Sequence, residues 1–124
     1  MAKIPKNLFW VIITLAMIYL SSCEKYSYEV KPPEISADTV FFKAEIQPIF
    51  DTKCVSCHKA SLSPDLRPDK SYKAIIDGGY VNVDLPAEES KLFKILDVPN
   101  HTSFTTLDER NKILSWIFQG TMDN

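Results

Sequence analysis

The sequence predicts a small all-α domain of about four short helices. Apolar residues recur at three- and four-residue spacing in several short segments, which is the spacing of one helical face. Proline and glycine residues separate these segments, and Thr106-Leu107-Asp108-Glu109 has the pattern of a helix capping box. The chain has 124 residues, which suffices for a single domain.

Residues 1–22 have the pattern of a signal peptide. A basic start precedes Leu8–Leu20, an uncharged apolar run that is shorter than the roughly 20 residues a membrane span needs. The sequence Leu20-Ser21-Ser22-Cys23 follows, and it resembles the lipobox of bacterial lipoproteins. This resemblance implies cleavage before Cys23 and a lipid on its thiol. The alternative is an ordinary signal peptide or an uncleaved anchor, with Cys23 incidental.

Residues 23–38 are expected to form a flexible tether between the lipid and the domain 39–124. The segment is polar, lacks helical periodicity and contains Lys31-Pro32-Pro33-Glu34, which favours extended backbone. Fully extended, its sixteen residues reach at most roughly 50 Å.

The first helix of the domain is expected just before Cys54. Ile46, Ile49 and Phe50 fall on one helical face, and Pro48 makes this helix short or kinked. The following segment, Lys59–Lys70, contains two prolines and is expected to be a loop.

Three further segments follow the loop. Ser71–Asp77 is expected to be a short helix that stops at Gly78-Gly79, and Tyr80–Leu85 alternates weakly, as an extended segment would. A helix over Ala87–Leu96 is expected next, because Pro86 suits its first turn and Pro99 ends it.

The last helix begins at the capping box and ends at Gly120. Trp116 lies beside Ile117 and three residues after Ile113, so it is expected in the core rather than at a docking surface. About 85 ordered residues without a disulfide make a thin core, and small domains of this kind usually need a metal or a cofactor.

Cys54-Val55-Ser56-Cys57-His58 is the motif that carries chemistry. Cys-x-x-Cys-His is the pattern of a c-type haem attachment site. Two intervening residues form about one helical turn, which separates the two sulfurs by the distance between the haem vinyl groups. His58 would then coordinate the iron as the proximal ligand. The alternatives are a thioredoxin-like dithiol, which needs a βαβ setting, and a zinc site, which needs four ligands.

Residues 40–124 resemble the small cytochrome c domain of lipoproteins from Bacteroidota-type bacteria. The matching segments are Ile46-Gln47-Pro48-Ile49-Phe50, Leu66, Tyr72, Gly78-Gly79, Ser90-Lys91-Leu92, Asp108-Glu109, Trp116-Ile117, Gly120-Thr121 and Asp123-Asn124. The resemblance implies a class I-like cytochrome c fold of about four short helices around one covalent haem c, bound through Cys54 and Cys57.

The sequence departs from this family at the distal iron ligand. The family has Met-Pro before the last helix, where this chain has His101-Thr102-Ser103-Phe104. After removal of residues 1–22, His101 and Met122 are the remaining histidine and methionine besides His58, and both are donors that haem iron accepts. His101 is the preferred candidate, with Met122 or an open position as the alternatives.

The expected function is electron transfer by an exported, lipid-anchored mono-haem cytochrome, placed on the outer membrane and facing the periplasm. Removing residues 1–22 takes away two lysines and leaves all 16 acidic residues, so the net charge changes from −2 to −4. This charge argues against nucleic acid and permits docking to a basic redox partner protein. Small-ligand sensing, or a role as accessory haem subunit of a membrane-associated assembly, is the alternative. No enzymatic activity is expected, because the sequence contains no catalytic cluster.

Overall fold

The computed structural model describes residues 5, 7, 10 and 34–124. The predicted signal segment 1–22 lies almost wholly outside the described residues, and Cys23 lies outside them too. Residues 32–124 form one compact unit, separate from residues 1–31. Within the part of the chain that the structure describes, no helix is long and apolar enough to cross a bilayer.

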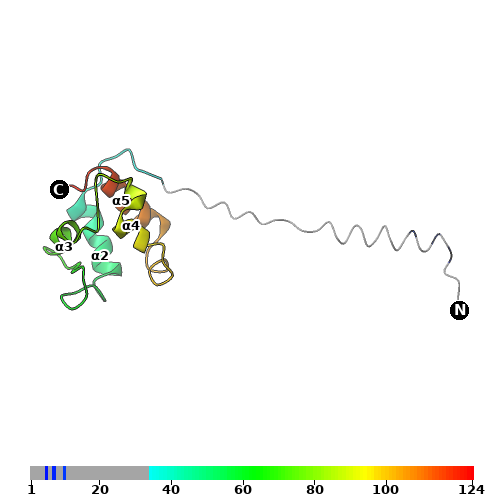
Figure 1. The fold of residues 1–124 in the computed structure, drawn as a ribbon, viewed down its shortest axis with the longest axis horizontal. Helices are drawn as coiled ribbons and strands as arrows, with labels where there is room; N and C mark the ends of the chain where they lie inside the picture. Colours follow the sequence, from blue (N-terminus) through cyan, green and yellow to red (C-terminus); the bar gives the residue numbers. More distant parts are fainter. Residues whose placement is uncertain (1–4, 6, 8–9, 11–33) are drawn as a thin grey trace. The chain divides into compact units, whose positions relative to one another are not determined.

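The described residues of this unit are helical and contain no strand, in agreement with the predicted all-α class. In chain order the elements are the π-helical turn η1 (Phe42–Ile46), α2 (Gln47–Lys53), α3 (Ser71–Asp77), the 3₁₀ turn η2 (Ala87–Glu89), α4 (Lys91–Ile95) and α5 (Leu107–Phe118). The turn η1 packs against α2 and α5, and both η2 and α4 pack against α5 (Figure 1).

Local sequence explains where the helices begin and end. Pro48 occupies the first turn of α2, where a missing N–H costs nothing. The capping box of α5 is confirmed, because the Thr106 side chain accepts from the Glu109 N–H and the Glu109 carboxylate accepts from the Thr106 N–H. Gly120 follows this helix with φ +94°, a conformation that favours glycine and ends α5 as predicted.

Two expectations for residues 80–96 need correction. Tyr80–Leu85 forms no strand and instead contains a turn, in which the Leu85 N–H donates to the Asn82 carbonyl. The helix predicted over Ala87–Leu96 is divided into η2 and α4 at Ser90. Ser90 has extended backbone (ψ 142°), and its hydroxyl accepts from the Phe93 N–H, so it caps α4.

An aromatic cluster lies at the centre of the core. The Phe42 ring lies 5.0 Å from the Trp116 ring and 5.3 Å from the Tyr72 ring, measured between centroids. Trp116 is 1% exposed, so its predicted place in the core is confirmed. The buried apolar residues around the cluster include Val40, Ile46, Ile49, Phe50, Leu66, Ile75, Leu92, Ile113, Leu114 and Ile117.

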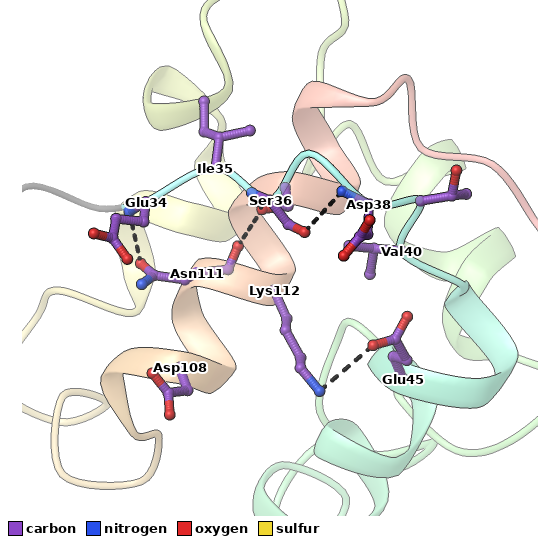
Figure 2. A pocket seen from close by; sticks show the side chains of 11 residues that line it. Glu34, Ile35, Ser36, Asp38, Val40, Glu45, Asp108, Asn111 and Lys112 are labelled. Atoms are coloured by element: carbon purple, nitrogen blue, oxygen red, sulfur yellow. Dashed lines mark hydrogen bonds and ion pairs between the residues drawn. The ribbon is translucent and has the colours of Figure 1, made fainter.

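Residues 34–40 lie along α5 rather than away from it. Asn111, Ser115 and Gln119 are spaced four residues apart, so they share one face of that helix. The Asn111 and Ser115 side-chain oxygens accept from backbone N–H groups of residues 34 and 36, and Gln119 both accepts from the N–H of residue 40 and donates to the carbonyls of residues 36 and 38. The last part of the predicted tether, 34–38, is therefore docked on the domain (Figure 2).

A hollow of about 630 Å³ lies between residues 34–40 and α5 (Figure 2). Its lining includes the carboxylates of Asp38, Glu45 and Asp108, and the Lys112 ammonium pairs with Glu45 at 3.5 Å. About half of its lining is polar, whereas the lining of the cavity beside Cys54 is almost wholly apolar.

Candidate functional site

The sequence Cys54–His58 forms a helical turn directly after α2. The N–H groups of Cys57 and His58 both donate to the Cys54 carbonyl, at 3.1 and 2.9 Å. Cys54 is half-buried and Cys57 is exposed. The one-turn conformation expected from the Cys-x-x-Cys spacing is therefore present, and α2 fixes where it begins.

His58 is oriented by the loop that follows it. Its Nδ1 lies 3.2 Å from the Pro64 carbonyl oxygen, and the His58 carbonyl accepts from the Leu66 N–H at 3.1 Å. A histidine whose Nδ1–H donates to a backbone carbonyl keeps the lone pair of Nε2 available for a metal.

A largely apolar cavity of about 470 Å³ adjoins this turn. Cys54, Cys57 and His58 lie in its lining, and further lining residues come from α4 and from the loop between α4 and α5. Its apolar lining residues include Phe50, Leu62, Leu66, Leu92, Leu96 and Phe104. The volume lies within the range of roughly 300–1,000 Å³ for small-molecule and cofactor sites, which are likewise mostly apolar.

His101 lines the same cavity, and its ring lies 6.3 Å from the His58 ring, with an angle of 43° between the ring planes. A metal atom held in line between two imidazole nitrogens, with bonds of about 2 Å each, separates the ring centroids by roughly 6 Å. The Nδ1 atom of His101 is buried and has no hydrogen-bond partner among the described residues. An unpartnered buried nitrogen beside an apolar cavity fits a group that binds there.

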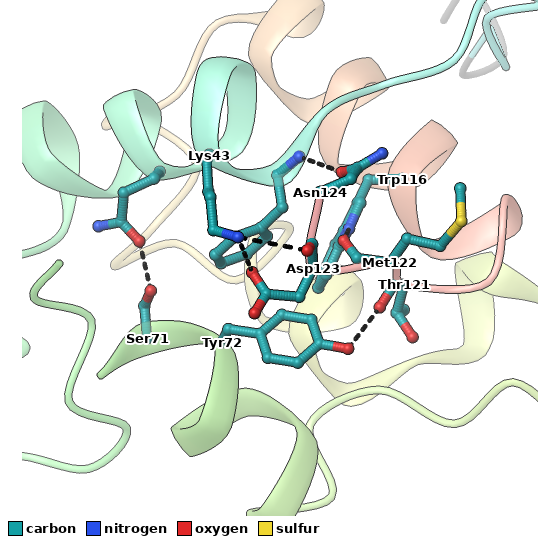
Figure 3. A network of polar contacts seen from close by, with 10 residues as sticks. Lys43, Ser71, Tyr72, Trp116, Thr121, Met122, Asp123 and Asn124 are labelled. Carbon is teal, nitrogen blue, oxygen red and sulfur yellow. Dashed lines mark hydrogen bonds and ion pairs between the residues drawn. The ribbon is translucent and has the colours of Figure 1, made fainter. Parts of the chain in front are cut away.

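Met122 lies apart from this cavity lining, in the C-terminal tail. The tail is held over the aromatic cluster, because the Tyr72 hydroxyl donates to the Thr121 carbonyl and the Trp116 indole N–H donates to the Met122 carbonyl (Figure 3). Asn124 then accepts from the N–H groups that begin η1. The Met122 side chain is 47% exposed.

The setting of Cys54 is opposite to that of a redox-active dithiol. Such a cysteine lies at a helix N-terminus with a lowered pKa, whereas Cys54 is at the C-terminal end of α2. Burial, and secondarily the Glu109 carboxylate, raise the pKa of the Cys54 thiol to about 11. The thiol is therefore protonated at neutral pH.

Among residues 34–124 and the three described residues before them, no group of three or more His, Cys, Asp and Glu side chains is placed to hold a metal ion.

No protein-family model matches this chain, and no curated protein or solved structure shows significant similarity to it. The site therefore rests on the motif and on the geometry of the cavity.

The structure brings together Cys54, Cys57, His58 and His101, while Met122 lies elsewhere and Cys23 is outside the described residues. Sequence reasoning missed the residues that hold the loop after His58. Gln47 is buried in α2 and donates to the Leu66 carbonyl, and it accepts from the Ser71 hydroxyl. The available signal was that Gln47 lies three residues before Phe50, on the apolar face of α2.

Proposed function

We propose that this domain binds one haem c and transfers electrons. The observation that carries the proposal is that Cys54-x-x-Cys57-His58 and His101 line one apolar cavity, with 6.3 Å between the centroids of the two imidazole rings. A cytochrome c-like arrangement of the helices around the haem is part of the proposal.

The residues of the cavity have distinct roles in this proposal. Cys54 and Cys57 would hold the haem through two thioether bonds, each formed by addition of the thiol S–H across one vinyl group. His58 would hold the iron through Nε2, with its Nδ1 donating to the Pro64 carbonyl. The apolar lining excludes water. The bound haem supplies a one-electron redox centre.

His101 is the proposed distal ligand, and this favours electron transfer over small-ligand sensing. A gas would have to displace the His101 side chain before it could bind the iron. Two imidazole ligands should also give a lower reduction potential than a histidine–methionine pair, because an axial methionine raises it.

We further propose that the domain is exported and anchored through a lipid on Cys23, on the outer membrane and facing the periplasm. The support is the order of basic start, apolar run and Ser21-Ser22-Cys23 in the sequence. The net charge of −4 after processing suits a redox partner protein with a basic docking face.

Intact mass and absorption spectra of the membrane-extracted protein test both proposals together. The full chain is produced in a host that attaches haem c and processes lipoproteins. We expect a chain that begins at Cys23 and carries one haem and lipid, with a low-spin ferric spectrum. A mass without haem contradicts the cytochrome proposal, and a haem-bearing chain without lipid contradicts only the anchor. Five-coordinate iron would instead favour ligand sensing.

A further inference from the structure

The two histidines of the cavity differ in how firmly the chain holds them. His58 is fixed from both sides, because its Nδ1 meets the Pro64 carbonyl and its own carbonyl accepts from Leu66. The Leu66 carbonyl in turn accepts from buried Gln47 of α2, and Gln47 accepts from Ser71 of α3. This side of the cavity is therefore connected to two helices by a buried and satisfied network.

His101 lies on a loop, residues 98–106, whose backbone hydrogen bonds are local. The N–H groups of residues 101 and 102 donate to the Val98 carbonyl, and that of residue 104 donates to the His101 carbonyl. These hydrogen bonds fix the shape of the loop. They do not attach it to the helices, so its position relative to them depends on other contacts.

One ion pair joins the start of this loop to α5. Asp97, directly after α4 and its cap, pairs with the Arg110 guanidinium. Arg110 is in the second turn of α5, after the capping box that closes the other end of the loop. Its side chain is 21% exposed, and its Nε is buried without a hydrogen-bond partner in the described part of the chain. The guanidinium is thus packed against the protein, with Asp97 as its acidic partner.

We propose that Arg110 is a positioning residue for His101. By holding Asp97, it fixes the loop 98–106 against α5 and so determines how readily His101 leaves the iron and an added ligand replaces it. This inference rests on the proposed function, since it requires a haem with His101 as the distal ligand.

The test is the rate at which added imidazole replaces the distal ligand of the ferric, haem-loaded protein. Arg110→Gln and Asp97→Asn should each bind imidazole about twofold to fivefold faster than the parent, the range for loss of a partly exposed ion pair. Arg110→Lys keeps the charge and should retain part of the effect. Raising the ionic strength should speed the parent and leave Arg110→Gln unchanged, because salt screens the pair that only the parent has.

Lys112→Gln is the matched control, because Lys112 lies on the same helix as Arg110 but pairs with Glu45 of η1, beside the hollow of Figure 2. Its imidazole rate should equal that of the parent. Low-spin haem with equal rates and equal salt dependence in the parent, Arg110→Gln and Asp97→Asn would overturn the positioning role. Failure of the parent to bind haem, or a low-spin spectrum that survives His101→Ala, would instead contradict the proposed site.

Discussion

His101 and Met122 are the two side chains that the sequence offers as a distal ligand, and their surroundings differ. The His101 ring lines the apolar cavity, and its centroid lies 6.3 Å from that of the His58 ring. Met122 is held through its carbonyl by Trp116, and its side chain is directed to solvent at the far end of α5. The geometry therefore supports the imidazole as the donor.

Replacing each residue in turn separates the two candidates. His101→Ala should convert the low-spin ferric haem to a high-spin or water-ligated form, because the cavity then has no second imidazole. Met122→Ala should leave the spectrum nearly unchanged. Absorption and electron paramagnetic resonance spectra provide the measurement. A sulfur-to-iron charge-transfer band in the parent, or loss of the low-spin spectrum in the Met122 variant, would show that the histidine assignment is wrong.

For single residues of the site, the sequence predicts which side chains carry the chemistry better than it predicts which backbone groups hold them in place. Cys54, Cys57 and His58 are recognisable because their spacing is itself the motif. The partner of His58 is the carbonyl of Pro64, and every residue has a carbonyl, so nothing in the residue type identifies it. Gln47 donates to the carbonyl of Leu66, which lies in the loop before α3. The sequence of this loop has no periodic pattern from which its path could be predicted.

The helix α5 is the element that the sequence predicts most completely. Its start, its end and its buried face all follow from local patterns, because capping and 3.6-residue periodicity act over a few residues. The single helix predicted over 87–96 was wrong because Pro86, which suits the first turn of a helix, precedes only the separate 3₁₀ turn η2. Ser90 caps α4 from extended backbone, and its preference for that position was the signal against a continuous helix.

Loss of the α5 cap should have a measurable cost. Thr106→Ala removes the hydroxyl that accepts from the Glu109 N–H, so the free energy of unfolding should fall by about 1 kcal/mol. Urea denaturation of the haem-loaded protein gives this value. Thr39→Ala, at an exposed position before η1, is the matched control and should change stability by much less. Equal losses in the two variants would mean that the capping box contributes nothing.

The whole domain is built around two centres, the aromatic cluster and the cavity. The helices around the cavity are short, and α4 has only five residues, so contacts within each helix stabilise them little. A cofactor in the cavity would give Leu92, Leu96 and Phe104 a common surface to pack on.

Folding should therefore depend on the haem. The variant that carries both Cys54→Ala and Cys57→Ala cannot attach the cofactor, and its thermal unfolding should lose the cooperative transition of the parent. Circular dichroism at increasing temperature is the measurement. Cys23→Ala is the control, because it removes only the proposed lipid site and should melt like the parent. A sharp, parent-like transition in the double variant would contradict the dependence.

In a lipid-anchored chain, the docked segment 34–40 would shorten the distance that the domain can travel from the membrane. The linker between the lipid and residue 34, whose N–H donates to Asn111, would then be the eleven residues 23–33. Its greatest contour length is then about 37 Å, against roughly 50 Å for sixteen free residues. The volume that the domain could search would shrink to about two-fifths, which would raise its effective concentration near a partner in the same membrane. By binding residues 34–40, the polar face of α5 would thus shorten the linker between the lipid and the domain.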